Sequence, residues 1–380
     1  MRDIIKFLSY VKQFAKSSEE VICFISEVPL DDRNGAGVRV VNSYFSNLNK
    51  SVKYISIYLR DDLSFSDNQH AYFKFKKTGI INGILFLVLA ELFLLKSKKI
   101  NAVILPNGKD DIFLGTLFAL SRKFNSITWI MDDCLAPLEK TSFFNRLVAK
   151  LFLKFSDKVI VISEGMKRAY QQRYQITVDA ILGKYIEEKQ FNWSKANRKI
   201  KTDSKIKIIW MGKFQYLYLQ PFQELKKFCE SQTSKNFDFI IDIWGQEKPS
   251  EDILLSNVIE YKGAFTEDRK AEILLDYDYG IVTYSFNHEI VDLMQYSLPS
   301  KLIDYLSSNL KIICICPQAL WLNEFLKKDK ENLVFNSLDI QLILETIMKN
   351  SSNRTLKNQT IDQSLFKSES IQSFKQLLHN

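Results

Sequence analysis

Residues 296–315 read YSLPSKLIDYLSSNLKIICI and combine a helix pattern with a strand pattern. Proline is favoured in the first turn of a helix, so Pro299 predicts that a helix begins beside it. The apolar residues that follow recur at the spacing of one helix face: Leu302, Ile303 and Leu306. The apolar run over 310–315 is typical of a parallel strand covered on both faces. A helix that leads into such a strand is half of a βαβ unit, so the stretch predicts a doubly wound α/β domain.

The same alternation of strand and helix patterns runs along the rest of the chain. Further strand-like runs lie at 21–25, 52–58, 102–105, 127–130, 159–162, 206–210, 237–243, 258–261 and 279–282. For 380 residues, at roughly 100–200 per domain, two domains are expected. The sequence predicts α/β domains at 1–184 and 205–355, a polar linker between them, and a helical tail at 356–380 that packs back on the first domain.

The composition restricts the class of protein. Apolar residues make up 46% of the chain, which is enough for full-sized cores and excludes a disordered chain. The five cysteines show no paired CxxC spacing, which disfavours a disulfide framework and predicts a reducing, cytoplasmic compartment. The net charge of +8 is modest and carried by scattered lysines, so no nucleic-acid partner is expected. With three histidines and no obvious ligand cluster, no metal is expected.

Residues 80–95 raise the question of a membrane contact. This apolar stretch contains Asn82 and Glu91 and is shorter than the roughly 20 residues that a spanning helix needs. Lysines flank it on both sides: Lys74, Lys76, Lys77, Lys96, Lys98 and Lys99. Two interpretations fit: a core helix that leads into the strand at 102–105, or a helix that lies in an anionic leaflet with lysines at the headgroups. The second predicts peripheral contact with the inner membrane face through residues 74–99.

A glycine loop follows the first predicted strand. Gly35, Ala36 and Gly37 stand between that strand and the start of a helix, where free N–H groups and the positive helix end hold phosphates. The third glycine of a dinucleotide fingerprint is absent at Val40, which disfavours a dinucleotide oxidoreductase. An ordinary turn fits the same residues.

The first strand of the second domain also ends beside a glycine. The run at 206–210 leads into Gly212 and Lys213, which would place an ammonium group at the strand end, within reach of a diphosphate. A solvated surface lysine is the alternative interpretation.

The helix of the opening stretch carries the strongest set of candidate ligands. Its start, at Ser300, offers free N–H groups to an anion, and Lys301 adds a positive charge. Asp304 lies three residues further on the same helix face and can accept hydrogen bonds from sugar hydroxyls. A surface helix with an incidental ion pair fits the spacing as well.

Several motifs resemble retaining family-4-type glycosyltransferases of the GT-B fold. Residues 34–39 (NGAGVR) are similar to the early glycine loop of that family, and residues 158–167 resemble the last strand and helix of its first domain. Residues 296–306 resemble its donor-site helix. Residues 127–133 resemble a variant found in capsule and surface-polysaccharide transferases. The likeness covers both halves in the same order, from about residue 21 to residue 316.

The resemblance implies a site as well as a fold. Two Rossmann-like domains would face each other across a cleft and hold a nucleotide-sugar, mostly through the second domain. The donor would be bound by Gly35, Ala36, Gly37, Gly212, Lys213, Ser300, Lys301 and Asp304. In this assignment Asp304 binds the ribose hydroxyls, while the lysines and the helix start face the diphosphate.

The resemblance also suggests catalytic residues. Asp132 and Asp133 stand where relatives commonly present a histidine near the reacting sugar, so these two residues and Lys213 are the predicted catalytic set. A pair of solvated loop carboxylates is the alternative. The sequence departs from the family at Tyr296, eight residues before Asp304, where a carboxylate is usual. The usual arginine–lysine pair is reduced to Lys213.

The predicted reaction moves a sugar from a nucleotide-diphosphate sugar to a glycan or lipid-linked acceptor in surface-polysaccharide synthesis (capsule, O-antigen or exopolysaccharide). Retention of anomeric configuration is implied by the resemblance. Negative charge grows on the departing diphosphate, and fixed donors with a cation can stabilise it, so neither a metal nor a cofactor is expected. A nucleotide-sugar epimerase or a sugar phosphorylase on the same fold is the alternative.

Overall fold

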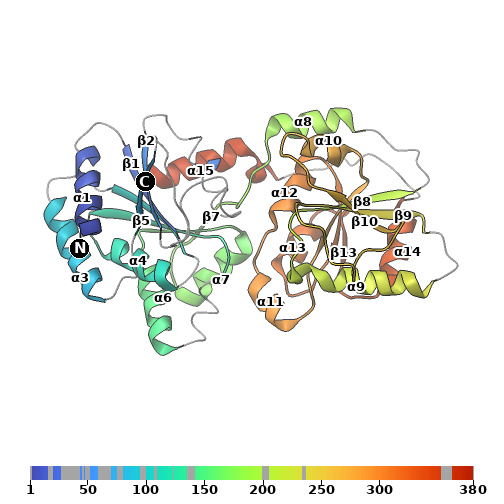
Figure 1. Cartoon of the computed structure of the whole chain (residues 1–380), viewed down its shortest axis with the longest axis horizontal. Helices are drawn as coiled ribbons and strands as arrows, with labels where there is room; N and C mark the ends of the chain where they lie inside the picture. The colour runs from blue at the N-terminus through green and yellow to red at the C-terminus, as the bar shows by residue number, and fades with distance from the viewer. Residues whose placement is uncertain are drawn as a thin grey trace. The chain divides into compact units, whose positions relative to one another are not determined.

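The computed structural model describes residues 2–15, 20–26, 43–44, 47, 52–58, 70–74, 80–94, 100–106, 109–121, 123–133, 135, 142–198, 205–232, 237–351 and 362–379. The chain divides into two compact units, residues 1–183 with 370–380, and residues 184–369. Each unit contains one sheet in which the named strands pair in parallel (Figure 1). The predicted α/β class with two doubly wound, Rossmann-like sheets is therefore confirmed.

The first unit is built on a seven-stranded sheet. Its strands are β1 (Glu20–Ser26), β2 (Val52–Tyr58), β3 (His70–Lys74), β4 (Ile100–Leu105), β5 (Phe124–Ile130), β6 (Lys158–Val161) and β7 (Asp179–Ala180), in the order β3-β2-β1-β4-β5-β6-β7. Its helices are α1 (Arg2–Ala15), α3 (Ile80–Phe93), α4 (Lys109–Leu120), α6 (Phe143–Phe155), α7 (Glu164–Tyr174) and most of α15 (Lys367–His379). The described side chains of β1, from Ile22 to Ser26, are buried, as expected of a strand covered on both faces.

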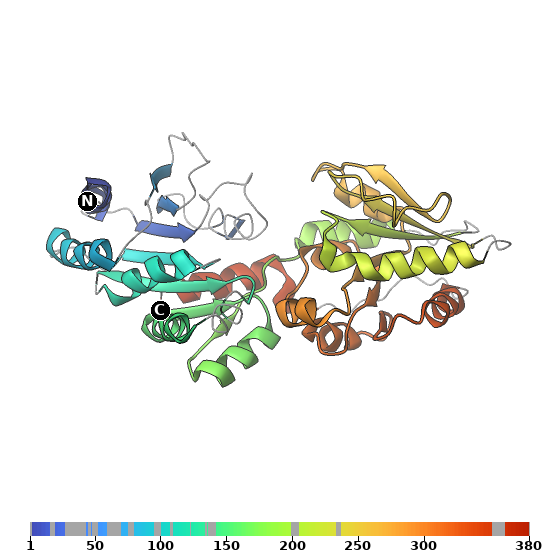
Figure 2. The same ribbon diagram turned by 60° about the horizontal axis from the view of Figure 1, so that its bottom comes forward.

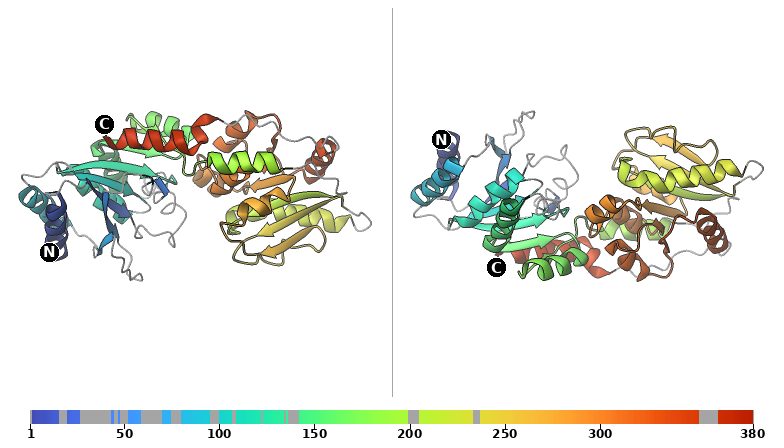
Figure 3. Two further views of the ribbon diagram at one scale, coloured as in Figure 1. Left: turned by 90° about the horizontal axis from the view of Figure 1, so that it is seen from above. Right: turned by 90° about the horizontal axis from the view of Figure 1, so that it is seen from below.

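Aromatic side chains form the core of the first unit. Phe118 of α4 contacts Phe86 of α3 and Phe124 of β5, at ring-centroid distances of 4.8 Å and 4.6 Å. Trp129 of β5 contacts Tyr44 and Phe374 of α15, both at 5.2 Å. The end of the chain thus belongs to the core of the first unit, and Figure 3 shows α15 running beside its sheet.

The second unit is built on a six-stranded sheet. Its strands are β8 (Ile206–Met211), β9 (Phe239–Trp244), β10 (Ile259–Gly263), β11 (Tyr279–Thr283), β12 (Lys311–Ile315) and β13 (Leu333–Phe335), in the order β10-β9-β8-β11-β12-β13. Its helices are α8 (Glu188–Asn197), α9 (Tyr216–Ser231), α10 (Lys270–Leu275), α11 (His288–Met294), α12 (Ser300–Ser307), α13 (Trp321–Lys327) and α14 (Ile340–Ser351), with the 3-10 turn η1 (Gln363–Leu365). Figure 2 shows α9 lying along the strands of this sheet.

The strand order of the second sheet reverses at β8. From β8 the chain proceeds outward through β9 to β10, and then returns to the other side of β8 with β11. In doubly wound sheets, ligands bind outside the carboxyl ends of the strands at such a switch point. The loops that follow β8 and β11 are therefore the part of this unit to search for a site.

The polar stretch predicted as a linker contains a helix instead. Residues 188–197 form α8, and Phe191 on it contacts Phe366 at a ring-centroid distance of 5.6 Å. Directly after α8, the Arg198 guanidinium donates hydrogen bonds to the carbonyl oxygens of Leu274, Tyr277 and Ser308. These contacts fix the stretch to the second unit. The polar, lysine-rich composition of the stretch does not indicate them.

Candidate functional site

The loop after β8 turns on a glycine. Gly212 has a φ of +112°, a backbone conformation that residues with a Cβ rarely adopt. Its N–H donates to the carbonyl oxygen of Trp244 at the end of β9, at 2.9 Å, and a Cβ on Gly245 would overlap the carbonyl oxygen of Gly212. Gly245 in turn donates to Gly263, which ends β10 and has a φ of +99°. Glycines thus line the ends of three neighbouring strands, and only the first was predicted.

Lys301 reaches this edge from α12. The position that a Cβ on Gly212 would occupy is 4.0 Å from Cε of Lys301. The Lys301 Nζ lies 3.0 Å from the ring centroid of Trp210 and 4.2 Å from that of Tyr218. The residue is 9% exposed, and Nζ has no hydrogen-bond partner among the described residues. Burial lowers the pKa of Lys301 well below its ordinary value.

Burying a lysine in this way costs folding free energy unless a ligand supplies acceptors for its N–H groups. The ring faces of Trp210 and Tyr218 attract a cation, yet they offer no acceptor for its three N–H groups. The residue before α12, Pro299, provides no side-chain cap for the first turn of the helix. The start of α12 thus combines the unpartnered Lys301 Nζ with a first turn that no side chain caps, and an anion is the ligand that suits both.

Tyr305 fixes α12 against the sheet. Its ring is fully buried over Gly280 of β11, and its hydroxyl accepts a hydrogen bond from the Met211 N–H at 2.9 Å. A Cβ on Gly280 would overlap the root of this ring, so the glycine allows the helix its close approach. One tyrosine thereby links α12 to both strands of the switch point.

We expect Gly280→Ala to destabilise the protein by about 1–3 kcal/mol, because the Tyr305 ring must move and its bond to Met211 is then lost. Urea unfolding of the full chain measures the effect. Gly183→Ala is the matched control, since its Cβ would meet Ile162 at an ordinary 3.4 Å. Equal stability of the two variants would contradict this packing.

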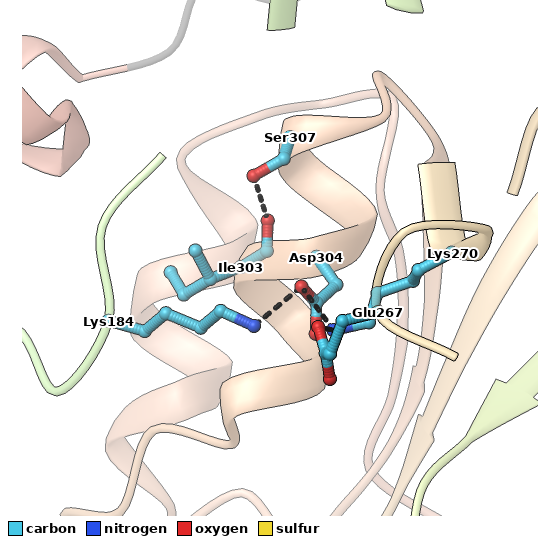
Figure 4. A network of polar contacts seen from close by, with 6 residues as sticks. All are labelled: Lys184, Glu267, Lys270, Ile303, Asp304 and Ser307. Atoms are coloured by element: carbon cyan, nitrogen blue, oxygen red, sulfur yellow. Dashed lines mark hydrogen bonds and ion pairs between the residues drawn. The ribbon is translucent and has the colours of Figure 1, made fainter. Parts of the chain in front are cut away.

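Asp304 lies one turn after Lys301 within a network of lysines (Figure 4). Its Oδ1 accepts a hydrogen bond from Lys184 at 2.6 Å and lies 3.4 Å from the Nζ of Lys270. Lys270 is 6% exposed and also pairs with Glu267. Burial alone would lower the pKa of Lys270, but the charges of Asp304 and Glu267 outweigh burial and raise it. Asp304 Oδ2 makes no polar contact with a described residue, so one oxygen can accept from a ligand.

Lys213 lies on the surface beside this edge. Its side chain is 62% exposed, and Nζ lies 3.4 Å from a carboxylate oxygen of Glu247. Ser300, at the start of α12, is also exposed. The structure thus brings together Gly212, Lys213, Ser300, Lys301 and Asp304 on adjoining parts of one unit.

The candidates of the first unit fall into different environments. Asp133 is 4% exposed and accepts a hydrogen bond from the Tyr170 hydroxyl at 2.7 Å, with Arg173 at 3.4 Å from its other oxygen. These contacts hold α7 to the end of β5. Asp132 is solvent-exposed, although partial desolvation raises its pKa. Gly35, Ala36 and Gly37 lie outside the described residues.

Sequence reasoning missed the groups that surround the predicted ones. Trp210 and Tyr218 belong to an aromatic cluster with Phe214 and Phe222, at centroid distances of 4.9–5.5 Å from Trp210. In the sequence, the apolar run around Trp210 predicts only a core position for that residue, and Tyr218 lies on a different element, α9. Within the described part of the chain no cluster of three or more His, Cys, Asp or Glu residues is suited to a metal, and no helix is long and apolar enough to cross a bilayer.

Two doubly wound units in one chain define the class of fold, and comparison with solved structures agrees. The chain is similar to a sucrose-phosphate synthase from Thermosynechococcus elongatus, at 13% identity and a TM-score of 0.60, over 95% of this chain and 99% of that one. It is similar to an α,α-trehalose 6-phosphate synthase from Burkholderia multivorans, at 8% identity and a TM-score of 0.56, over 96% and 95%. WaaG, a glycosyltransferase involved in lipopolysaccharide biosynthesis, matches at 11% identity and a TM-score of 0.50, over 88% and 90%.

These likenesses establish the GT-B fold of the chain. At such low identities they establish the fold alone. No protein-family model matches the sequence, and no curated protein matches it either.

Proposed function

We propose that the protein is a glycosyltransferase that takes a sugar from a nucleotide-diphosphate sugar. The observation that carries the proposal is the buried Lys301 Nζ, which has no acceptor among the described residues and lies beside the glycine-lined ends of β8 to β10. A diphosphate offers the oxygens and the negative charge that this ammonium and the uncapped start of α12 need. The transferases named among the similar structures support the reaction class.

In this proposal each group of the second unit has a role. Lys301 and the N–H groups at Ser300 bind the diphosphate, and Gly212 allows it to approach the backbone. Lys213 reaches the outer phosphate oxygens after leaving Glu247, with which it forms an exposed pair. Asp304 accepts from the ribose hydroxyls through Oδ2, while Lys184 and Lys270 hold Oδ1.

In this proposal, Lys301 accelerates the reaction because its positive charge already lies where the diphosphate departs. When the sugar–phosphate bond breaks, negative charge grows on the diphosphate, and a desolvated ammonium stabilises that charge more strongly than a solvated one. Lys301 is already desolvated by Trp210 and Tyr218, so little reorganisation is needed at that moment.

The finer parts of the assignment rest on the family resemblance. They are retention of configuration, a glycan or lipid-linked acceptor in surface-polysaccharide synthesis, and Asp132 and Asp133 near the reacting sugar. Peripheral membrane contact through residues 74–99 rests instead on the apolar stretch at 80–95 and the lysines that flank it. Of the two aspartates, Asp132 is the better candidate for substrate contact, since Asp133 is committed to Tyr170 and Arg173. Within 74–99 the described helix α3 exposes Ile84 and Val88.

The experiment is a thermal-shift panel of UDP, GDP, ADP and CMP with the full chain, followed by incubation with the sugar conjugate of the nucleotide that binds. We expect one diphosphate to raise the melting temperature by a few degrees, as saturating ligands do. Release of free nucleoside diphosphate only when an acceptor is added supports a transferase. Interconversion of nucleotide-sugars without acceptor would indicate an epimerase, and no response to any nucleotide would overturn the proposal.

A further inference from the structure

Helix α6 presents large apolar side chains to solvent on its outer face. Four of them are exposed: Phe143 (78%), Phe144 (60%), Leu147 (43%) and Phe155 (42%). Ordinary surfaces carry single apolar residues, whereas a group of this size on one helix marks an interaction surface. The helix itself is well formed, because Ser142 caps its start by accepting from the Asn145 N–H at 3.1 Å.

The inner face of α6 is already packed. Ala149, Phe152 and Leu153 are buried, and a Cβ on Gly115 of α4 would overlap the Phe152 ring. The helix therefore lies as close to α4 as the missing side chain of Gly115 allows, at the lower margin of the first unit in Figure 1. The exposed phenylalanines are a second apolar face, distinct from the one that holds the helix to its unit.

Three cations lie beside this second face. Arg146, Lys150 and Lys154 are exposed, and α6 contains no acidic residue. Lys150 and Lys154 form no ion pair with a described residue. At about 100° per residue, the four apolar side chains span an arc of about 120°, and the cations span an arc of about 80° that overlaps it by about 20° at Lys154. The outer face thus combines an apolar arc with a positive edge formed by Arg146 and Lys150, and Lys154 lies among the apolar side chains near the end of the helix.

We infer that α6 is an interfacial helix that docks on an anionic lipid surface. Lying in the plane of the bilayer, it would place the phenylalanine rings and Leu147 below the headgroups and the three cations among the phosphates. A protein partner fits less well, since lysine is depleted in protein interfaces whereas headgroups attract it. The inference concerns the first unit and does not depend on the proposed donor site.

Helix α3 offers a useful contrast within the same unit. It exposes Ile84 and Val88 but contains no lysine or arginine, and its Glu91 lies 3.9 Å from the Nζ of Lys123. Among the described residues only α6 joins exposed aromatic rings to a row of positive charges on one helix. We therefore assign the main lipid contact to α6 rather than to α3.

The test is flotation of the full chain with vesicles of pure phosphatidylcholine and of an equimolar mixture with phosphatidylglycerol. We expect binding to the anionic vesicles only, weakened by added salt. The double variants Phe143→Ser/Phe144→Ser and Lys150→Gln/Lys154→Gln should each weaken binding by tenfold or more, on the order expected for two lost insertions or two lost cations.

Matched controls remove the same groups elsewhere. Leu342→Ser removes a residue that is 52% exposed on α14, and Lys227→Gln/Lys349→Gln removes two exposed lysines from the second unit. Both should bind vesicles like wild type, and all variants should melt at the wild-type temperature. Equal binding to neutral vesicles, no binding to either kind, or unchanged binding by the α6 variants would overturn the inference. Self-association lost in the phenylalanine variant without vesicle binding would assign the face to a second copy instead.

Discussion

Replacing Lys301 by methionine is expected to raise the stability of the protein and to weaken its affinity for a nucleoside diphosphate. Methionine fills the space between Trp210 and Tyr218 with an apolar chain of similar length. The variant no longer buries an amine without an acceptor, and such replacements are neutral or stabilising. We expect about 1 kcal/mol of added unfolding free energy. Diphosphate affinity should fall about tenfold to hundredfold, because a charge-assisted contact is lost.

The depressed pKa of Lys301 sets the sign of the pH dependence of stability. The folded-state pKa of Lys301 lies below the value of about 10.4 in the unfolded chain, so folding releases a proton at pH values between the two. Stability of the wild type therefore rises with pH through that window, and the methionine variant lacks this contribution. A bound diphosphate reverses the shift by supplying an anion, so binding takes up a proton. Calorimetry in buffers of different ionisation enthalpy measures that uptake.

Lys213→Met is the matched control for Lys301→Met. Its ammonium is 62% exposed and pairs with Glu247 in solvent, so its loss should change stability by well under 1 kcal/mol. It should leave the proton uptake on binding intact. A Lys301→Met protein that binds diphosphate like the wild type, or that takes up the same proton, would contradict the assigned role.

The fold followed from patterns that are local in sequence. Continuous apolar runs at 206–210 and 310–315 predicted buried parallel strands, and these became β8 and β12. The failure at 188–197 has a physical cause. Helix α8 is held by long-range contacts such as Phe191 with Phe366, and no local periodicity signals a partner that lies far along the chain.

The candidate site, too, could be predicted only where the signal is local in sequence. Spacing along α12 was enough to place Lys301 and Asp304 on one helix. It could not reveal that Trp210 and Tyr218 enclose Lys301, because that contact depends on how α12 packs on the sheet through Tyr305 and Gly280. Nor could it reveal the partners of Asp304, which come from positions far away in the sequence.

Replacing Asp304 by alanine is expected to cause the largest loss of stability in the second unit. Its carboxylate lies between Lys184 and Lys270, and the Lys270 side chain is only 7% exposed. Without Asp304, Lys270 keeps a single partner, Glu267, which is 76% exposed and solvated. Leaving a buried charge short of a partner costs about 3–5 kcal/mol, and partial exposure of the network places our expectation near 3 kcal/mol.

Urea unfolding and thermal melting of the full chain measure this loss, which corresponds to a fall in melting temperature of about 6–12 °C. Since Lys270 has a raised pKa, its pairing persists until the pH rises above about 10.4, so the loss should be the same at about pH 7 and pH 9. Glu251→Ala breaks an ion pair between side chains that are 78% and 58% exposed and should cost under 1 kcal/mol.

Asp304→Asn separates the two roles proposed for this residue. The amide oxygen still accepts from Lys184, so more of the stability should survive than in the alanine variant, whereas a ribose diol loses its charged acceptor. The nucleoside diphosphate should then bind about tenfold more weakly even at temperatures where the variant is fully folded. Unchanged binding by the folded asparagine variant would confine Asp304 to holding its two lysines, and would leave Lys301 as the charged group that selects the donor.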